Sequence, residues 1–224
     1  MPPPVPPPRA RRVREEPAPG ASARRPLRVA LTGGIATGKS YVRGRFRDLG
    51  IPTIDSDTLA REAVAPGTAG LEAVIARFGS GVLDASGGLD RRKLGAIVFA
   101  DPVHRKALEA IIHPEVVRAS NAWFAALDPS HPFAIADIPL LYEVGRDRDF
   151  DAVVVTACDP EEQVRRVMQR DRLAETEARQ RIAAQLPIHE KVARADHVIW
   201  TDGSFAETDE QVSRVAKALT IHDS

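Results

Sequence analysis

The chain has 224 residues, of which 43% are hydrophobic and 28% charged, and its formal net charge at pH 7 is zero. This length can bury a sizeable core and suits one α/β domain with an insertion better than two independent domains. The charge balance does not indicate nucleic acid or an anionic membrane as a partner, so we expect a small substrate held by local charges. Cys158 is the only cysteine, which excludes an internal disulfide, and no apolar run approaches the length of a membrane-spanning helix. We therefore expect a reducing, cytoplasmic setting.

Residues 1–26 differ in composition from the rest, because they contain nine of the 18 prolines and six arginines. This composition predicts a disordered tail. The segment lacks the apolar stretch of a secretory signal, and its prolines and acids are untypical of a transit peptide. A solvated tail, a wrongly chosen start codon and a proline-rich ligand for a partner remain open.

The first predicted strand covers residues 27–32, and a phosphate-binding motif follows it directly: Gly33-Gly34-Ile35-Ala36-Thr37-Gly38-Lys39-Ser40. These residues match G-x-x-x-x-G-K-[ST], the pattern of a loop whose backbone amides cradle phosphates. Its glycines permit dihedral angles that turn successive amides inward, and a helix predicted over residues 39–49 adds the positive end of its dipole. We expect Lys39 to reach the β and γ phosphates and the Ser40 hydroxyl to suit a Mg²⁺ ligand. The motif therefore predicts binding of a nucleoside triphosphate.

Two carboxylates, Asp55 and Asp57, follow the second predicted strand at residues 51–55. In a parallel sheet they would emerge at the same edge as the phosphate-binding motif. Asp57 is a candidate base for an attacking hydroxyl, and Asp55 could hold a metal-bound water or shape the site. The alternative is that one of them caps the next helix. Arg61, four residues after Asp57, either pairs with that aspartate or reaches an anionic substrate.

Residues 56–131 contain no convincing buried strand, so we interpret them as a mostly helical insertion. The predicted helices cover residues 56–65, 68–78, 90–100 and 102–127. Such an insertion is well placed to hold an acceptor substrate above the strand ends. Within it, His113-Pro114 has the form of a helix start with proline at the first position. There the imidazole would either meet a substrate phosphate or cap the helix.

Three further strands are predicted at residues 132–138, 151–156 and 197–200. Short apolar runs that alternate with amphipathic stretches predict an α/β fold with about five parallel strands flanked by helices. Asp137, near the end of the third strand, is typical of a Walker B acid that binds Mg²⁺ directly or through water. Cys158 follows the fourth strand and is interpreted as core filling.

The segment from Asp159 to Gln185 is rich in arginine: Arg165, Arg166, Arg170, Arg172, Arg179 and Arg181. Helices are predicted here at residues 160–170 and 175–186, and a last one at 204–219. Small kinases need movable positive charge over the transferring phosphoryl group. A planar guanidinium group can bind two phosphate oxygens at once. We therefore interpret residues of about 170–190 as a helical lid.

These separated motifs together resemble the dephospho-CoA kinase family over about residues 27–220. The resemblance rests on Leu31-Thr32-Gly33-Gly34-Ile35 with Gly38-Lys39-Ser40, Ile54-Asp55-Ser56-Asp57 with Ala60-Arg61, Ile112-His113-Pro114, Ile138-Pro139-Leu140-Leu141 with Glu143, and Met168-Gln169-Arg170-Asp171. It implies a P-loop kinase fold that transfers phosphate from ATP, with Mg²⁺, to the 3′-hydroxyl of dephospho-CoA, giving coenzyme A and ADP.

The resemblance also implies roles for individual residues. Asp57 matches the family's proposed base, Arg166 and Arg170 its lid arginines, and the insertion its CoA-binding helical domain. Nucleotide contacts extend to Tyr41, and Gly203 matches the turn near the adenine. The substrates would be ATP and dephospho-CoA, without nucleic acid or membrane, and the oligomeric state is left open.

The chain departs from the family pattern in the phosphate-binding motif, where Ala36 and Thr37 replace glycine and serine and Tyr41 replaces threonine. A methyl group at position 36 is tolerable only if that residue avoids positive φ. Asp202 stands where asparagine is common, which puts a side-chain contact to adenine in doubt.

Three alternatives differ in class. A shikimate kinase also pairs this loop with Asp-Ser-Asp, but the helical insertion and His113-Pro114 argue against it. A GTPase switch would need an N-K-x-D signature, yet Asn121 is the sole asparagine. A paralogue without turnover is disfavoured because Lys39, Ser40 and Asp57 are all retained.

Overall fold

The computed structural model describes residues 25–221, so nearly all of the tail predicted over residues 1–26 lies outside the described residues. The chain divides into two compact units. We call residues up to Ile54 together with those from Leu127 onward the sheet unit, and Asp55–Ala126 the inserted unit. None of the helices within residues 25–221 has the length and apolar character needed to cross a membrane.

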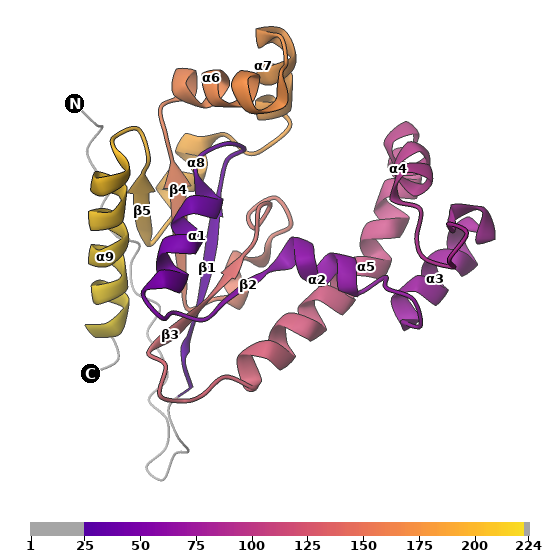
Figure 1. Cartoon of the computed structure of the whole chain (residues 1–224), viewed down its shortest axis with the longest axis horizontal. Helices are drawn as coiled ribbons and strands as arrows, with labels where there is room; N and C mark the ends of the chain where they lie inside the picture. The colour runs from indigo at the N-terminus through magenta and orange to yellow at the C-terminus, as the bar shows by residue number, and fades with distance from the viewer. Residues whose placement is uncertain (1–24, 222–224) are drawn as a thin grey trace. The chain divides into compact units, whose positions relative to one another are not determined.

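Five strands form the sheet in the order β2-β3-β1-β4-β5 (Figure 1). Their bounds are β1 Leu27–Gly33, β2 Thr53–Asp55, β3 Phe133–Asp137, β4 Ala152–Ala157 and β5 His197–Trp200. β1 pairs in parallel with both β3 and β4, and β4 pairs in parallel with β5. The predicted α/β fold with a five-stranded parallel sheet is confirmed. Its central strands are nearly continuous apolar runs because helices and loops cover both of their faces.

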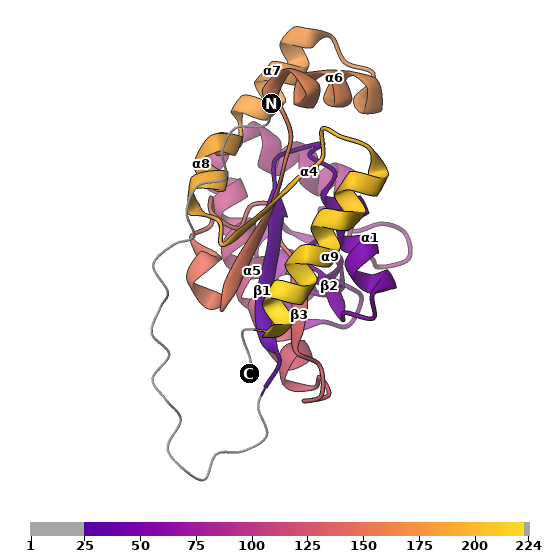
Figure 2. The same cartoon turned by 90° about the vertical axis from the view of Figure 1, so that its left-hand side faces the viewer.

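Helices α1 (Lys39–Asp48) and α9 (Phe205–Ile221) lie side by side in the sheet unit (Figure 2). Val42 and Phe46, one helical turn apart on α1, are fully buried with Val212 and Leu219 of α9. This shared cluster fixes the direction of α1 and therefore of the loop before it. Cys158, directly after β4, is fully buried as predicted, and burial raises the pKa of its thiol to about 12.

Three helices separate β4 from β5: α6 (Pro160–Asp171), α7 (Glu175–Ala183) and α8 (Ile188–Arg194). The sequence predicted the first two but not α8. Only two of its seven residues, Lys191 and Val192, are buried, so it is too short for a periodic apolar pattern.

The inserted unit is helical, with α2 (Ser56–Glu62), α3 (Ala69–Phe78), α4 (Arg91–Ala100) and α5 (Pro102–Ala125). Its core contains Val64, Val74, Val82 and Leu94, and Ile111 and Ile112 of α5 pack against them. The unit therefore buries an apolar cluster of its own.

The prediction that His113-Pro114 starts a helix is wrong, because Pro114 lies inside α5. The helix starts at Pro102 and is capped by Asp101, whose carboxylate accepts a hydrogen bond from Val103 N–H. Inside a helix, a proline removes a backbone donor and crowds the preceding turn. Burial of Val116 and Phe124 on one side of Pro114, and packing of Ile111 and Ile112 on the other, offset that cost.

A substitution pair tests the packing at the end of β1. A Cβ atom on Gly33 would meet the backbone oxygen of Thr156 at 2.7 Å, whereas one on Gly44 of α1 would meet nothing within 4 Å. We expect Gly33→Ala to lower the free energy of unfolding by about 1–3 kcal/mol. Gly44→Ala should raise it by about 0.5–1 kcal/mol, because alanine favours a helix. Urea denaturation of both variants measures the difference, and equal stability of Gly33→Ala and the parent would contradict the close approach.

Candidate active site

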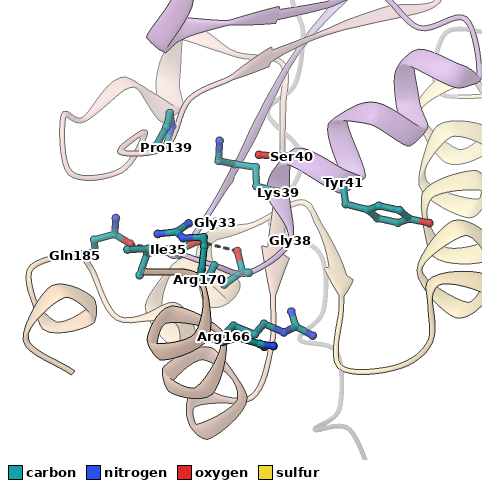
Figure 3. Close-up of a pocket in the computed structure, with 14 residues that line it drawn as sticks. Gly33, Ile35, Gly38, Lys39, Ser40, Tyr41, Pro139, Arg166, Arg170 and Gln185 are labelled. Atoms are coloured by element: carbon teal, nitrogen blue, oxygen red, sulfur yellow. Dashed lines mark hydrogen bonds between the residues drawn. The ribbon is translucent and has the colours of Figure 1, made fainter. Parts of the chain in front are cut away.

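The phosphate loop, residues 33–40, connects β1 to α1 and lines a cavity of about 540 Å³ in the sheet unit (Figure 3). Every residue of the motif contributes to this lining, and Tyr41 does too. Gly38 precedes α1 with a left-handed φ of 79°, so the free amides of the first helical turn begin at Lys39. A helix N-terminus of this kind attracts phosphate through its unpaired N–H groups and its dipole.

Ala36 has a φ of 58°, contrary to the expectation that its methyl group requires negative φ. The neighbouring residues explain how this conformation is held. The buried Thr37 hydroxyl donates to Gly34 O at 2.9 Å and lies 2.9 Å from the Thr156 hydroxyl. Gln163 Nε2 donates to Ile35 O at 2.8 Å. With the backbone fixed on both sides of Ala36, the fold imposes the left-handed conformation and carries its cost.

Side chains from outside the motif therefore hold the phosphate loop in place. Besides Thr156 and Gln163, Gln185 Oε1 accepts a hydrogen bond from Ile35 N–H at 2.8 Å, and Thr201 Oγ1 donates to Thr37 O at 3.2 Å. None of these four was predicted from the sequence. They are neutral residues outside any recognised motif, so no sequence signal marks them.

Lys39, the first residue of α1, forms an ion pair with Asp137, the last residue of β3. Asp137 lies opposite Leu31 in the register of β3 and β1, and its side chain is 2% exposed. Arg43 Nη1 also lies 3.1 Å from Asp137 Oδ2. Arg43 was not predicted, although its position four residues after Lys39 places both cations on one face of α1. Two cations thus compensate one buried carboxylate beside the phosphate loop.

The donors around Asp137 fit a Mg²⁺ ion bound together with phosphates. Mg²⁺ takes oxygen ligands and is commonly held by one or two carboxylates with substrate phosphate oxygens. Asp137 supplies such a carboxylate and Ser40 a hydroxyl. Within residues 25–221 no group of three or more His, Cys, Asp or Glu side chains could hold a metal ion, so the nucleotide would have to complete the ligand set.

One face of α6 supplies positive charge to the cavity, where Arg166, Gln169 and Arg170 belong to the lining. Arg166 donates to the hydroxyl of Thr201 at 2.8 Å and to its carbonyl oxygen. Its Nε donates to Glu162 Oε1 at 2.6 Å. The pKa of Glu162 is lowered to about 2, first by the hydrogen bonds that it accepts from Arg165 and then by the one that it accepts from Arg166. Glu162 is therefore ionised at neutral pH and holds Arg166 in place.

Three of the remaining arginines in this region pair with nearby acids. Arg165 bonds Glu162, Arg181 lies 3.0 Å from Asp171, and Arg179 bonds both Glu161 and Glu175. Arg172 ends α6 with a φ of 55°. None of these four is among the residues that line the cavity. Of the arginine-rich segment, the cavity thus receives Arg166 and Arg170.

Asp55, Asp57, Arg61 and His113 belong to the inserted unit, whereas the cavity is lined by the sheet unit. Asp55 Oδ1 accepts a hydrogen bond from Asp57 N–H at 2.9 Å, so Asp55 is the residue that caps α2. Asp57 and Arg61 are exposed, and within residues 25–221 neither side chain has a hydrogen bond or an ion pair. His113 is exposed in the middle of α5.

The turn after β5 holds Asp202 and Gly203. Asp202 Oδ1 accepts a hydrogen bond from Asp159 N–H at 2.6 Å, which connects this turn to the start of α6. A Cβ atom on Gly203 would collide with the Glu207 carboxylate, which accepts from Ser204 N–H at 2.7 Å. Asp202 therefore has a structural role here, and Gly203 is not among the residues that line the cavity.

A parallel sheet with a phosphate loop after its first strand, beside a buried acid and an arginine-bearing helix, defines the class of P-loop kinases. A family model described as dephospho-CoA kinase matches residues 27–207. The chain belongs to the dephospho-CoA kinase family.

Individual relatives agree with this assignment. A dephospho-CoA kinase from Thermosynechococcus vestitus is 45% identical over 194 residues, which cover 86% of this chain and 95% of the relative. A crystal structure from Thermus thermophilus superposes with a TM-score of 0.75 at 36% identity, covering 87% of this chain and 98% of that one. The structure of the dephospho-CoA kinase from Campylobacter jejuni superposes with a TM-score of 0.69 at 28% identity, covering 88% of this chain and 98% of that one.

The left-handed conformation of Ala36 leads to a stability prediction. Replacement by glycine, which adopts positive φ freely, should raise the free energy of unfolding by about 1 kcal/mol. Ala76→Gly, at an exposed position inside α3, should lower it by about 1 kcal/mol, because there the backbone is helical. Urea denaturation without nucleotide measures both changes. A loss of stability in Ala36→Gly would show that residue 36 does not have positive φ.

Proposed function

We propose that this protein transfers the γ-phosphoryl group of ATP to the 3′-hydroxyl of dephospho-CoA, giving coenzyme A and ADP. The observation that carries the proposal is that the phosphate loop, with Lys39, shares one cavity with Arg166 and Arg170. Family membership supports dephospho-CoA as the acceptor. A transferring phosphoryl group needs in-line positioning and compensation of charge, and this cavity supplies donors and cations for both.

On the donor side, the loop amides and the first turn of α1 would bind the phosphates, and Lys39 would contact the β and γ phosphate oxygens. Arg166 and Arg170 would approach from α6 and neutralise charge on the γ phosphate. Ser40 and Asp137 would hold Mg²⁺, which supplies further charge neutralisation between the phosphates. Tyr41 lines the cavity and would contact the nucleotide there. Its hydroxyl donates a hydrogen bond to Asp209 of α9 at 2.8 Å.

On the acceptor side, we assign the role of base to Asp57. Because Asp55 caps α2 through Asp57 N–H, the Asp57 carboxylate is left for a substrate hydroxyl. Asp55, Arg61 and His113 are proposed to contact dephospho-CoA, and Gly203 to contact the adenine of ATP. Residues of about 170–190 are proposed to act as the lid, and the cytoplasmic location stays a prediction.

A coupled assay of ADP release tests the proposed reaction. Purified protein should consume ATP when dephospho-CoA is present and form coenzyme A with ADP in equal amounts. Shikimate and adenylate serve as competing acceptors, and chromatography identifies the products. Comparable turnover of either competitor, or none with dephospho-CoA, would overturn the proposal.

Two substitutions separate the proposed roles of the base and of the phosphate-loop lysine. Asp57→Asn keeps the size of the side chain but cannot accept the proton, so kcat should fall by about 10²–10⁴-fold with little change in ATP affinity. Lys39→Ala should lower both kcat and ATP affinity. Glu72→Gln, an exposed acid on α3, is the charge-matched control and should behave like the parent. Full activity of Asp57→Asn would remove its role as base.

A further inference from the structure

Lys191 on α8 is fully buried, although lysine is rarely excluded from solvent without a partner. It is not part of the cavity lining and has no place in the transfer described above. A buried ammonium group is costly unless its charge is paired and its protons are bonded. Its partners therefore indicate what the residue is for.

The Lys191 ammonium has two partners in the sheet unit. Nζ lies 2.7 Å from Glu143 Oε1 and donates to the carbonyl oxygen of Gly33 at 3.2 Å. Gly33 is the last residue of β1 and the first of the phosphate loop. The same Glu143 oxygen accepts a hydrogen bond from Leu186 N–H at 3.0 Å. The ion pair thus connects the phosphate loop to the segment after β3 and to the segment that precedes α8.

The next residue back along the chain closes this connection into a ring. Gln185, directly before Leu186, accepts a hydrogen bond from Ile35 N–H at 2.8 Å. The path runs from Gly33 through Lys191, Glu143 and Gln185 to Ile35. The two contacts with the loop, at Gly33 and at Ile35, therefore flank Gly34.

This ring fixes the orientation of the first peptide group of the loop. In a planar trans peptide, the carbonyl of one residue and the N–H of the next point in opposite directions. A donor that holds Gly33 C=O therefore also sets the direction of Gly34 N–H, and Gly34 lines the phosphate cavity. Gly34 has no side chain through which this peptide could otherwise be held.

We propose that Lys191, neutralised by Glu143, is a positioning residue that holds the phosphate loop in its nucleotide-binding geometry. Its effect on turnover rests on the kinase activity proposed above; its effect on nucleotide affinity does not. The competing explanation is that the pairing of the buried Lys191 with the more exposed Glu143 contributes only to stability. The two explanations differ in what happens when both charges are removed together.

The decisive variant is the double substitution Lys191→Met with Glu143→Gln. Replacing both members of an ion pair with neutral side chains of similar size is often harmless to stability, whereas removing one member leaves the other charge unpaired. Glutamine at position 143 can still accept from Leu186 N–H, but methionine at position 191 cannot donate to Gly33 C=O. The double variant therefore restores charge balance without restoring the donor to the loop.

We expect Lys191→Met alone to lower both Tm and nucleotide affinity. The double variant should recover most of the Tm, yet its KM for ATP and its Kd for ADP should stay about tenfold above the parent values. Its KM for dephospho-CoA should stay within about twofold of the parent value. Lys191→Arg keeps a charged donor and should have a Kd for ADP within about threefold of the parent. Lys217→Met, at an exposed lysine of α9, is the matched control.

Calorimetric titration with ADP and steady-state kinetics on the intact protein give these values, and thermal unfolding gives Tm. Recovery of ADP affinity together with Tm in the double variant would overturn the proposal and leave Lys191 with a role in stability alone. If the parent protein binds ADP but does not phosphorylate dephospho-CoA, the proposed function fails while the ADP affinities still test Lys191. Should Lys191→Met not fold, the double variant and Lys191→Arg carry the comparison.

Discussion

The close approach of β1 and β4 at Gly33 and Thr156 is the constraint on which the site depends. These residues are register partners, and a methyl group on Gly33 would collide with both the side chain and the backbone of Thr156. The same Thr156 hydroxyl lies against Thr37 inside the loop. The strand pairing therefore sets where the loop begins and supplies one of the contacts that shape it.

Around this point the loop is held by side chains that come from outside the phosphate-binding motif. Thr201 and Gln163 bond its carbonyl oxygens, Gln185 bonds an amide, and Lys191 bonds the carbonyl at its start. These contacts fix the backbone before a ligand arrives, so binding phosphate need not order it. They also explain why an alanine can occupy a left-handed position in the loop.

Much of the sheet and part of the site followed from the sequence, because their signals are local. The strand predicted at residues 27–32 is Leu27–Gly33, and that predicted at 151–156 is Ala152–Ala157. A strand followed by G-x-x-x-x-G-K-[ST] specifies a backbone shape over a few residues, which is why the phosphate loop could be located. For Lys39 and Asp137, the sequence predicted only that both lie at the same edge of the sheet, because they follow or end parallel strands. It did not predict that the two side chains form an ion pair.

The parts that could not be predicted depend on contacts distant in sequence. Lys191 meets Gly33 158 residues away, and no spacing rule connects them. The positive φ of Ala36 is imposed by Thr37 and Gln163 against the intrinsic preference of alanine. Pro114 was misjudged because proline favours a helix start locally, while apolar packing on both sides keeps α5 continuous.

The hydrogen-bonded pair of Glu162 and Arg166 has a consequence for how the pH dependence of turnover should be interpreted. A carboxyl group whose pKa is lowered to about 2 contributes its stabilisation above its ordinary value of 4.5 and loses it only as the pH falls towards 2. Across the range in which a kinase is assayed, Arg166 therefore keeps the same anionic partner. A loss of activity at the acidic end of the pH–rate profile between pH 5 and 8 would have to come from other groups, such as the nucleotide phosphates or the proposed base and the hydroxyl that it activates.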